Sequence, residues 1–139
     1  MTVLRVKGAP LAIDGTLVMG VVNASPDSFS DSRSSNFDSQ RTQCDALIAA
    51  GADIIDIGGQ SAITNRPEVE AEVEAQLVAP LVEWMAAEHP DVLVSVDTYK
   101  PLVVDAVLTA GASIINDVSG LLYPEIVPSV TRHDAALVI

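Results

Sequence analysis

The sequence is poor in cysteine and in basic side chains. It has one cysteine, Cys44, so an internal disulfide is excluded and a reducing compartment is expected. Seven Lys and Arg residues stand against 19 Asp and Glu residues, for a formal net charge of −12. Because nucleic acids and anionic membranes are bound by clustered Lys and Arg, we expect neither as a partner. A small phosphorylated ligand needs only a few donors and is compatible with this charge.

Long apolar runs and nucleotide-binding motifs are also missing. No apolar stretch approaches the roughly 18 residues that suggest a membrane-spanning helix, and no charged-then-apolar leader opens the chain. We therefore expect a cytoplasmic protein that does not enter a membrane. The strings G-x-G-x-x-G and G-x-x-x-x-G-K-[ST] are absent, which argues against dinucleotide and P-loop sites.

What the chain does contain is a regular alternation of short apolar runs and helical patterns. After a short N-terminal segment, the expected strands are 17–23, 53–57, 92–96, 112–116 and 133–139. The expected helices are 38–50, with Asp38 as N-cap, and 69–88, 100–110 and 123–132. This order predicts one α/β domain with a parallel sheet. A flavodoxin-like sheet and part of an eight-fold barrel both fit.

Polar residues or glycines end the first four of these runs. The residues concerned are Asn23, Gly58, Asp97 and Asn116. The carboxyl ends of parallel strands are where α/β folds place their chemistry, so these positions indicate one shared site. Each polar residue also has a structural interpretation: a turn for Asn23, helix capping for Asp97 and a buried network for Asn116.

One carboxylate interrupts an apolar run instead of ending it. Asp56 lies inside DIIDI, the run that stops at Gly58. We expect its side chain to point away from the mouth of the sheet or into a polar network in the core. Its role is predicted to be structural.

Four segments resemble one known family. They are MGVVNASPDSFSD (19–31), AGADIIDIGGQS (50–61), VSVDTYKP (94–101) and AGASIINDVSG (110–120). Their order and spacing resemble dihydropteroate synthase, a pterin-binding (β/α)₈ barrel enzyme. The resemblance implies an α/β fold that is a partial (β/α)8 TIM barrel with the first four to five βα units. Residues 1–139 would then be the N-terminal part of a pterin-binding domain.

The resemblance also implies a reaction and its residues. The family condenses 6-hydroxymethyl-7,8-dihydropterin pyrophosphate with p-aminobenzoate, an arylamine, and Mg²⁺ assists departure of pyrophosphate. Asn23 matches the magnesium and pyrophosphate residue, and Asp97 the catalytic, pterin-binding carboxylate. Asn116 matches a pterin-binding amide. Further substrate-binding positions are Phe29 in the first loop, and Ser61 and Ala62 in the second.

Two departures from the family pattern affect this expectation. Where the family usually reads Gly-Gly-Glu-Ser-Thr-Arg-Pro-Gly, this chain reads GGQSAITN, so Ala62 and Ile63 replace Thr and Arg. Loss of that Arg removes five donors and a charge, for which Arg66 or Arg33 is a hypothetical substitute. A complete barrel needs roughly 250 residues. We therefore expect this chain alone to be catalytically dead or very weak, as a fragment of a longer enzyme.

Two alternatives remain beside the synthase. One is a pterin-binding paralogue with another second substrate, similar to pterin-dependent methyltransferases, although those relatives lack the PDSFSD loop of residues 26–31. The other is a half barrel that binds pterin without catalysis, which the altered second loop favours. In its full-length form the family is commonly a homodimer.

Overall fold

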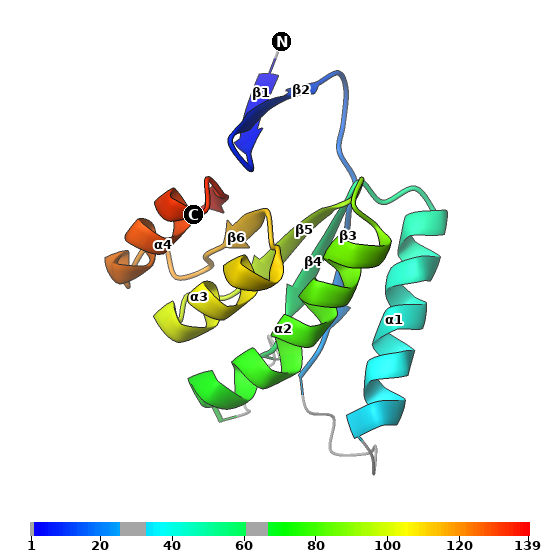
Figure 1. Ribbon diagram of the computed structural model, residues 1–139, viewed down its shortest axis with the longest axis vertical. Coiled ribbons are helices and arrows are strands. Elements are labelled where there is room, and N and C mark those ends of the chain that lie inside the picture. Colours follow the sequence, from blue (N-terminus) through cyan, green and yellow to red (C-terminus); the bar gives the residue numbers. More distant parts are fainter. Residues whose placement is uncertain (1, 26–32, 61–66) are drawn as a thin grey trace.

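A five-stranded parallel sheet forms the centre of the computed structural model, which describes residues 2–25, 33–60 and 67–139 (Figure 1). Its strands are β3 (Met19–Asn23), β4 (Ile54–Gly58), β5 (Leu93–Asp97), β6 (Ile114–Asn116) and β7 (Ala136–Val138). They lie side by side in chain order, and every neighbouring pair is parallel. A flavodoxin-like sheet reverses its strand order at a switch point. The uninterrupted order excludes that alternative.

The helices of the repeating units pack along the sheet (Figure 1). They are α1 (Arg33–Ala49), α2 (Ala71–Glu88), α3 (Pro101–Ala110), the 3₁₀ turn η1 (Pro124–Ile126) and α4 (Val127–Arg132). The prediction of Asp38 as an N-cap was wrong, because α1 begins at Arg33 and Asp38 lies inside it on the solvent side. Burial of the stripe that contains Gln40 and Cys44 supports this helix, and such packing outweighs local start signals.

Successive side chains of each strand point to opposite faces of the sheet, and an apolar cluster forms on each face. The residues that face the helices include Ile55, Ile57, Val94, Val96 and Ile115, all at most 1% exposed. On the opposite face Ile54, Ile114 and Ala136 pack against Val6. Val6 belongs to an antiparallel hairpin of β1 (Thr2–Val6) and β2 (Ala9–Ile13). The hairpin therefore covers the inner face of the sheet at the amino ends of its strands.

The carboxyl ends of the strands are left for the site. The register aligns Asn23, Gly58, Asp97, Asn116 and Val138 in one row across the sheet. Two residues earlier on each strand, Val21, Asp56, Ser95 and Ile114 form the next row on the same face. In the described part of the chain, no helix is long and apolar enough to cross a membrane.

Candidate functional site

A small cavity opens at the row of strand ends. Its volume is about 120 Å³, and its lining residues are Val21, Val22, Asn23, Asp56, Gly58, Gln60 and Asp97. Gly58 lies in register between Asn23 and Asp97, and because it has no side chain it leaves space between them. Adjacent strands are about 4.8 Å apart, so a ligand in this gap can contact both neighbours. The strand ends that were predicted to form one site do lie side by side.

Asp97 is the carboxylate with the most perturbed acidity at this cavity. Its pKa is raised to about 6, chiefly by burial and then by the nearby carboxylates of Asp56, Glu74 and Asp117. No hydrogen bond to the Asp97 carboxylate is found among the described residues, and α3 begins without a side-chain cap. The capping interpretation therefore does not apply. An acceptor that is partly desolvated and unpaired is suited to the N–H donors of a ligand.

Asn23 lies at the end of β3 and is exposed. Its Oδ1 accepts a hydrogen bond of 2.9 Å from the backbone N–H of Ser25, which is the turn geometry anticipated as its structural role. An amide oxygen has two lone pairs, so one remains for a hard cation. Among the described residues there is no cluster of three or more His, Cys, Asp or Glu side chains that could hold a metal ion.

Asn116 and Asp56 belong to one hydrogen-bonded network. Asn116 Nδ2 donates to Asp56 Oδ2 at 3.3 Å, and Ser95 Oγ donates to Asp56 Oδ1 at 2.6 Å. Asp56 is 5% exposed and Ser95 is fully buried. Of the two orientations expected for Asp56, the polar network is confirmed, while the orientation away from the mouth was wrong. The register explains this, because Asp56 occupies the inner face one row below Asp97.

Lys100 fixes the loop that follows β4. Its Nζ donates to Gln60 Oε1 at 3.1 Å, to Glu74 Oε2 at 2.7 Å and to the backbone oxygen of Val69. The Glu74 side chain is 2% exposed. Since Gln60 also lines the strand-end cavity, Lys100 connects the site to the start of α2.

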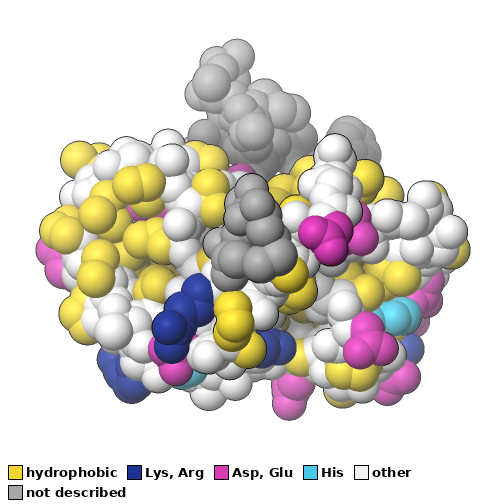
Figure 2. All heavy atoms as spheres, turned by 90° about the horizontal axis from the view of Figure 1, so that it is seen from above, with side chains coloured by type: hydrophobic (Ala, Val, Ile, Leu, Met, Phe, Trp, Pro, Cys, Tyr) yellow, Lys and Arg dark blue, Asp and Glu magenta, His cyan; other side chains and the backbone are white. Residues whose placement is uncertain are grey.

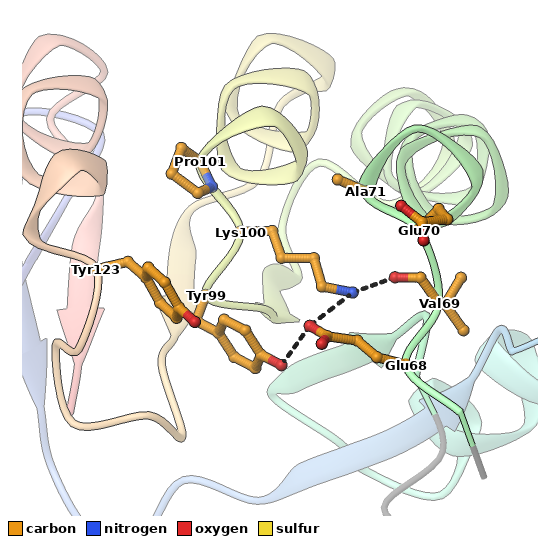
Figure 3. A pocket seen from close by; sticks show the side chains of 8 residues that line it. All are labelled: Glu68, Val69, Glu70, Ala71, Tyr99, Lys100, Pro101 and Tyr123. Carbon is orange, nitrogen blue, oxygen red and sulfur yellow. Dashed lines mark hydrogen bonds and ion pairs between the residues drawn. The ribbon is translucent and has the colours of Figure 1, made fainter.

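A second cavity, of about 280 Å³, lies beside Lys100 between the first turns of α2 and α3 (Figure 3). Tyr99 and Tyr123 stack along one side with ring centroids 5.5 Å apart, and Ala71 and Val69 face them. The Tyr99 hydroxyl donates to Glu68 Oε1 at 2.9 Å. The Tyr99 hydroxyl and the Lys100 ammonium of this lining thus have protein partners already, which is typical of a structural contact between helices.

Figure 2 views the molecule from the side of the hairpin, at the amino ends of the strands, and there hydrophobic side chains gather on the half where α3 and α4 lie. The chain as a whole offers few positive charges, with 19 acidic against 7 basic residues. An anionic ligand would therefore depend on local donors such as backbone N–H groups, side-chain amides or a bound cation.

Several predicted positions lie outside the described residues. They are Phe29 in the first loop and Ser61, Ala62, Ile63 and Arg66 in the second. Arg33 begins α1, but its side chain is likewise not described. The predictions made for these residues stay predictions.

Three residues of the site were missed by the sequence interpretation. Asp56 was assigned a structural role only, and Gln60 and Lys100 were assigned none. The signal for Asp56 was its spacing of two from Gly58, which places both on one face of a strand. Lys100 and Gln60 gave no usable signal, because a contact over 40 positions depends on how α2 and α3 pack.

Known proteins resemble the chain over most of its length. A probable bifunctional folylpolyglutamate synthase/dihydropteroate synthase of Haloferax volcanii is 48% identical over 81% of this chain and 13% of its own length. Dihydropteroate synthase of Streptococcus pyogenes is 40% identical over 96% of this chain and 51% of its own. An inactive dihydropteroate synthase 2 of Mycobacterium tuberculosis is 37% identical over 94% of this chain and 41% of its own. The chain thus spans about half the length, or less, of these relatives.

Solved structures agree in fold. A 7,8-dihydropteroate synthase from Vibrio fischeri matches with a TM-score of 0.86 and 33% identity, over 99% of this chain and 49% of its own. The Xanthomonas albilineans enzyme with 4-aminobenzoic acid matches with a TM-score of 0.82 and 36% identity, over 96% and 50%. These matches confirm the expected fold, the first part of a (β/α)₈ barrel. The pterin binding enzyme family matches residues 19–139, and the chain belongs to this family.

Proposed function

We propose that this chain is the N-terminal part of a dihydropteroate synthase, a transferase of folate biosynthesis. It would condense 6-hydroxymethyl-7,8-dihydropterin pyrophosphate with p-aminobenzoate. The observation that carries the proposal is the row Asn23, Gly58, Asp97 and Asn116, of which the first three line one cavity, in a chain of the pterin-binding family. Relatives named dihydropteroate synthase and a neighbour crystallised with 7,8-dihydropteroate support it.

The residues of this row have complementary roles in the proposal. The Asp97 carboxylate accepts hydrogen bonds from the amino-pyrimidine edge of the pterin, and the Asn116 amide supplies an oxygen beside it. Because Asp97 is an anion in a partly desolvated site, it also stabilises the positive charge that develops on the pterin methylene as pyrophosphate leaves. Donors and acceptors are thus fixed before the substrate arrives.

Mg²⁺ would be held on the substrate side of Asn23. One lone pair of Asn23 Oδ1 accepts the Ser25 N–H, and the other fits a hard cation that keeps several waters and binds a diphosphate. When bound, the ion would neutralise charge on the departing pyrophosphate. We expect its affinity to depend on the pyrophosphate, since the described residues include no cluster of three or more His, Cys, Asp or Glu side chains that could hold the ion alone.

Calorimetric titration of the 139-residue chain with the pterin pyrophosphate tests the proposal. Binding is expected, and it should strengthen when Mg²⁺ is added. Asp97→Asn should weaken it by about tenfold or more, because one charged hydrogen-bond acceptor is lost. The absence of pterin binding by the folded wild-type chain would overturn the proposal. On addition of p-aminobenzoate we expect no turnover or very slow turnover from this chain alone, and full synthase turnover would contradict that expectation.

A second candidate is a pterin-binding protein without synthase activity. It is favoured by the inactive dihydropteroate synthase 2 relatives and by Ala62 and Ile63 in the second loop. A variant that restores the family residues, Ala62→Thr with Ile63→Arg, separates the candidates. If this chain still binds p-aminobenzoate, as the synthase proposal requires, Arg66→Ala should weaken arylamine binding measured in the presence of pyrophosphate. If Arg66→Ala has no effect and the restored variant gains arylamine binding, arylamine recognition has been lost in this chain.

Location and assembly are proposed from the cysteine content and from the family resemblance. The single cysteine agrees with a reducing cytoplasm. Burial raises the pKa of the Cys44 thiol to about 11, so it is an inert core residue. A homodimer of the full-length protein follows from the family resemblance. Sedimentation of that protein would test it.

A further inference from the structure

The amide of Asn116 is held in one orientation by a buried carboxylate. Asn116 ends β6 in the row of site residues, and Asp56 lies one row below on β4. An ionised carboxylate only accepts hydrogen bonds, so the amide must turn its NH₂ group toward Asp56 Oδ2, at 3.3 Å. The amide oxygen therefore points away from Asp56. No hydrogen bond to this oxygen is found among the described residues, which leaves it available to a ligand.

Ser95 prevents the carboxylate from rotating away. Its hydroxyl is fully buried and donates to Asp56 Oδ1 at 2.6 Å. Ser95 is also the register partner of Asp56 on β5. Both oxygens of Asp56 are thus held, one by a side chain of the adjacent strand β5 and the other by a side chain of β6, and this favours one orientation of the carboxylate.

We propose that Asp56 is a positioning residue that locks the Asn116 amide, so that its oxygen and not its NH₂ group is offered to the pterin. The proposal rests on the function proposed above. It assigns specificity to a side chain that lies one row below Asp97 in the lining of the same cavity. A ring edge that presents N–H donors to both Asp97 and Asn116 is accepted, whereas an edge that presents an acceptor to Asn116 is disfavoured.

The charge of Asp56 acts in the same direction. It is one of the carboxylates that raise the pKa of Asp97, to about 6, after the larger effect of burial. A ligand edge with N–H donors relieves this concentration of negative charge. Exchange of Asp56 for a neutral residue would therefore change both the orientation of Asn116 and the field at Asp97.

A reciprocal exchange of side chains tests the orientation. In Asp56→Asn, the buried Ser95 hydroxyl keeps the new amide oxygen as its acceptor, so the new NH₂ group faces that of Asn116 and forces it to flip. Pterin binding, measured with 6-hydroxymethyl-7,8-dihydropterin, should fall by about tenfold. In the double variant D56N/N116D the NH₂ group of residue 56 again meets an acceptor, and binding should return to within about threefold of wild type.

Two further measurements distinguish positioning from plain stability. Asp105→Asn is the matched control, since Asp105 accepts a hydroxyl hydrogen bond from Ser129 on the helical layer, and it should leave pterin binding unchanged. Urea unfolding of every variant shows whether the protein measured is folded. In the free wild-type chain, an NMR signal of the Asn116 side-chain NH₂ should show one proton protected from exchange, and this protection should disappear in D56N.

The outcomes separate this inference from the proposed function. A wild-type chain that binds no pterin refutes the function, and the NMR signal then decides the Asn116 orientation alone. If folded D56N binds pterin as the wild type does, or if the double variant binds no better than D56N, Asp56 does not position the ligand contact. Rapid exchange of both Asn116 NH₂ protons in the wild type would also refute the lock.

Discussion

Asp97 meets two requirements that oppose each other. Ligand binding favours an ionised acceptor, whereas burial and neighbouring carboxylates raise its pKa to about 6. Because the folded chain holds this proton more tightly than the unfolded chain, stability falls as pH rises from the ordinary Asp value of 3.8 through about 6. At neutral pH the ionised side chain is therefore a cost to folding that serves the site.

Asp97→Asn should accordingly raise stability at neutral pH while it weakens pterin binding. After allowance for solvent screening we expect a gain of about 1–2 kcal/mol at pH 7.5 and almost none at pH 4. Urea unfolding at both pH values measures this. The exposed Asp91→Asn is the control, and its effect should be the same at both. A destabilised Asp97→Asn at pH 7.5 would show that the carboxylate has a favourable partner in the folded chain.

Glu74 presents the opposite case, a buried carboxylate with a partner. Its Oε2 lies 2.7 Å from Lys100 Nζ, and the two side chains are 2% and 11% exposed. Glu74→Gln should lower the free energy of unfolding by about 3 kcal/mol, because it leaves the largely buried Lys100 ammonium with only the exposed Glu68 carboxylate, 3.6 Å away, as counter-ion. Glu72→Gln, exposed on the same helix, should change it by less than about 0.5 kcal/mol. If the two variants change thermal or urea unfolding equally, the backbone oxygen of Val69, Gln60 and Glu68 suffice as partners for Lys100.

At the scale of elements, the turns that end helices were easier to predict than the helix starts. Gly51 and Gly111 come directly after the last turns of α1 and α3, and both have a positive φ, of 100° and 113°, which is the conformation in which glycine ends helices. The start of α1 was misplaced because its first residues, 33–36, are all polar and give no apolar periodicity by which a helix is recognised. Strand identity followed from the apolar runs. Which face each residue occupies was not known until the register was fixed, and this is why Asp56 was underestimated.

Gly58, the last residue of β4, and Gly59 after it give a test of packing at this scale. A Cβ on Gly59 would lie 2.6 Å from Glu74 Cγ and 2.7 Å from Val78 Cγ2, whereas one on Gly58 would come no closer than 3.7 Å to Asp97 Cβ. Gly59→Ala should therefore destabilise the chain by about 2–3 kcal/mol, as overpacking typically does. Gly58→Ala should leave stability nearly unchanged but reduce pterin binding, since it fills the gap in the cavity. Thermal unfolding and titration of both variants check this, and similar stabilities would contradict the close approach of α2.

For the whole molecule, fold and family were predictable because three features of the sequence indicate the same fold. They are the alternation of strands and helices, the polar residues at the strand ends and the four segments that resemble the family. The full set of residues that form the site could not be predicted. Asn23, Asp97 and Asn116 could be identified since a polar residue directly follows an apolar run. The contact of Lys100 with Gln60 and the network below Asn116 depend on tertiary packing, which a single sequence does not encode in any local pattern.

The sheet itself leads to the last prediction, because among the described strands β3 and β7 pair on one side only. Apolar side chains lie exposed at both, with Val21 63% and Val138 47% exposed. Unpaired strand edges with apolar side chains are templates for pairing with another chain. We therefore expect the 139-residue chain to associate with itself in a concentration-dependent manner.

Sedimentation velocity should show this association in the wild type and its loss in a Val21→Lys, Val138→Lys variant, since charged edges oppose pairing. Val118→Lys, equally exposed at 67% but in a loop, should still associate. A wild type that stays monomeric, or a loop variant as monomeric as the edge variant, would mean that the strand edges are not what this molecule uses to associate.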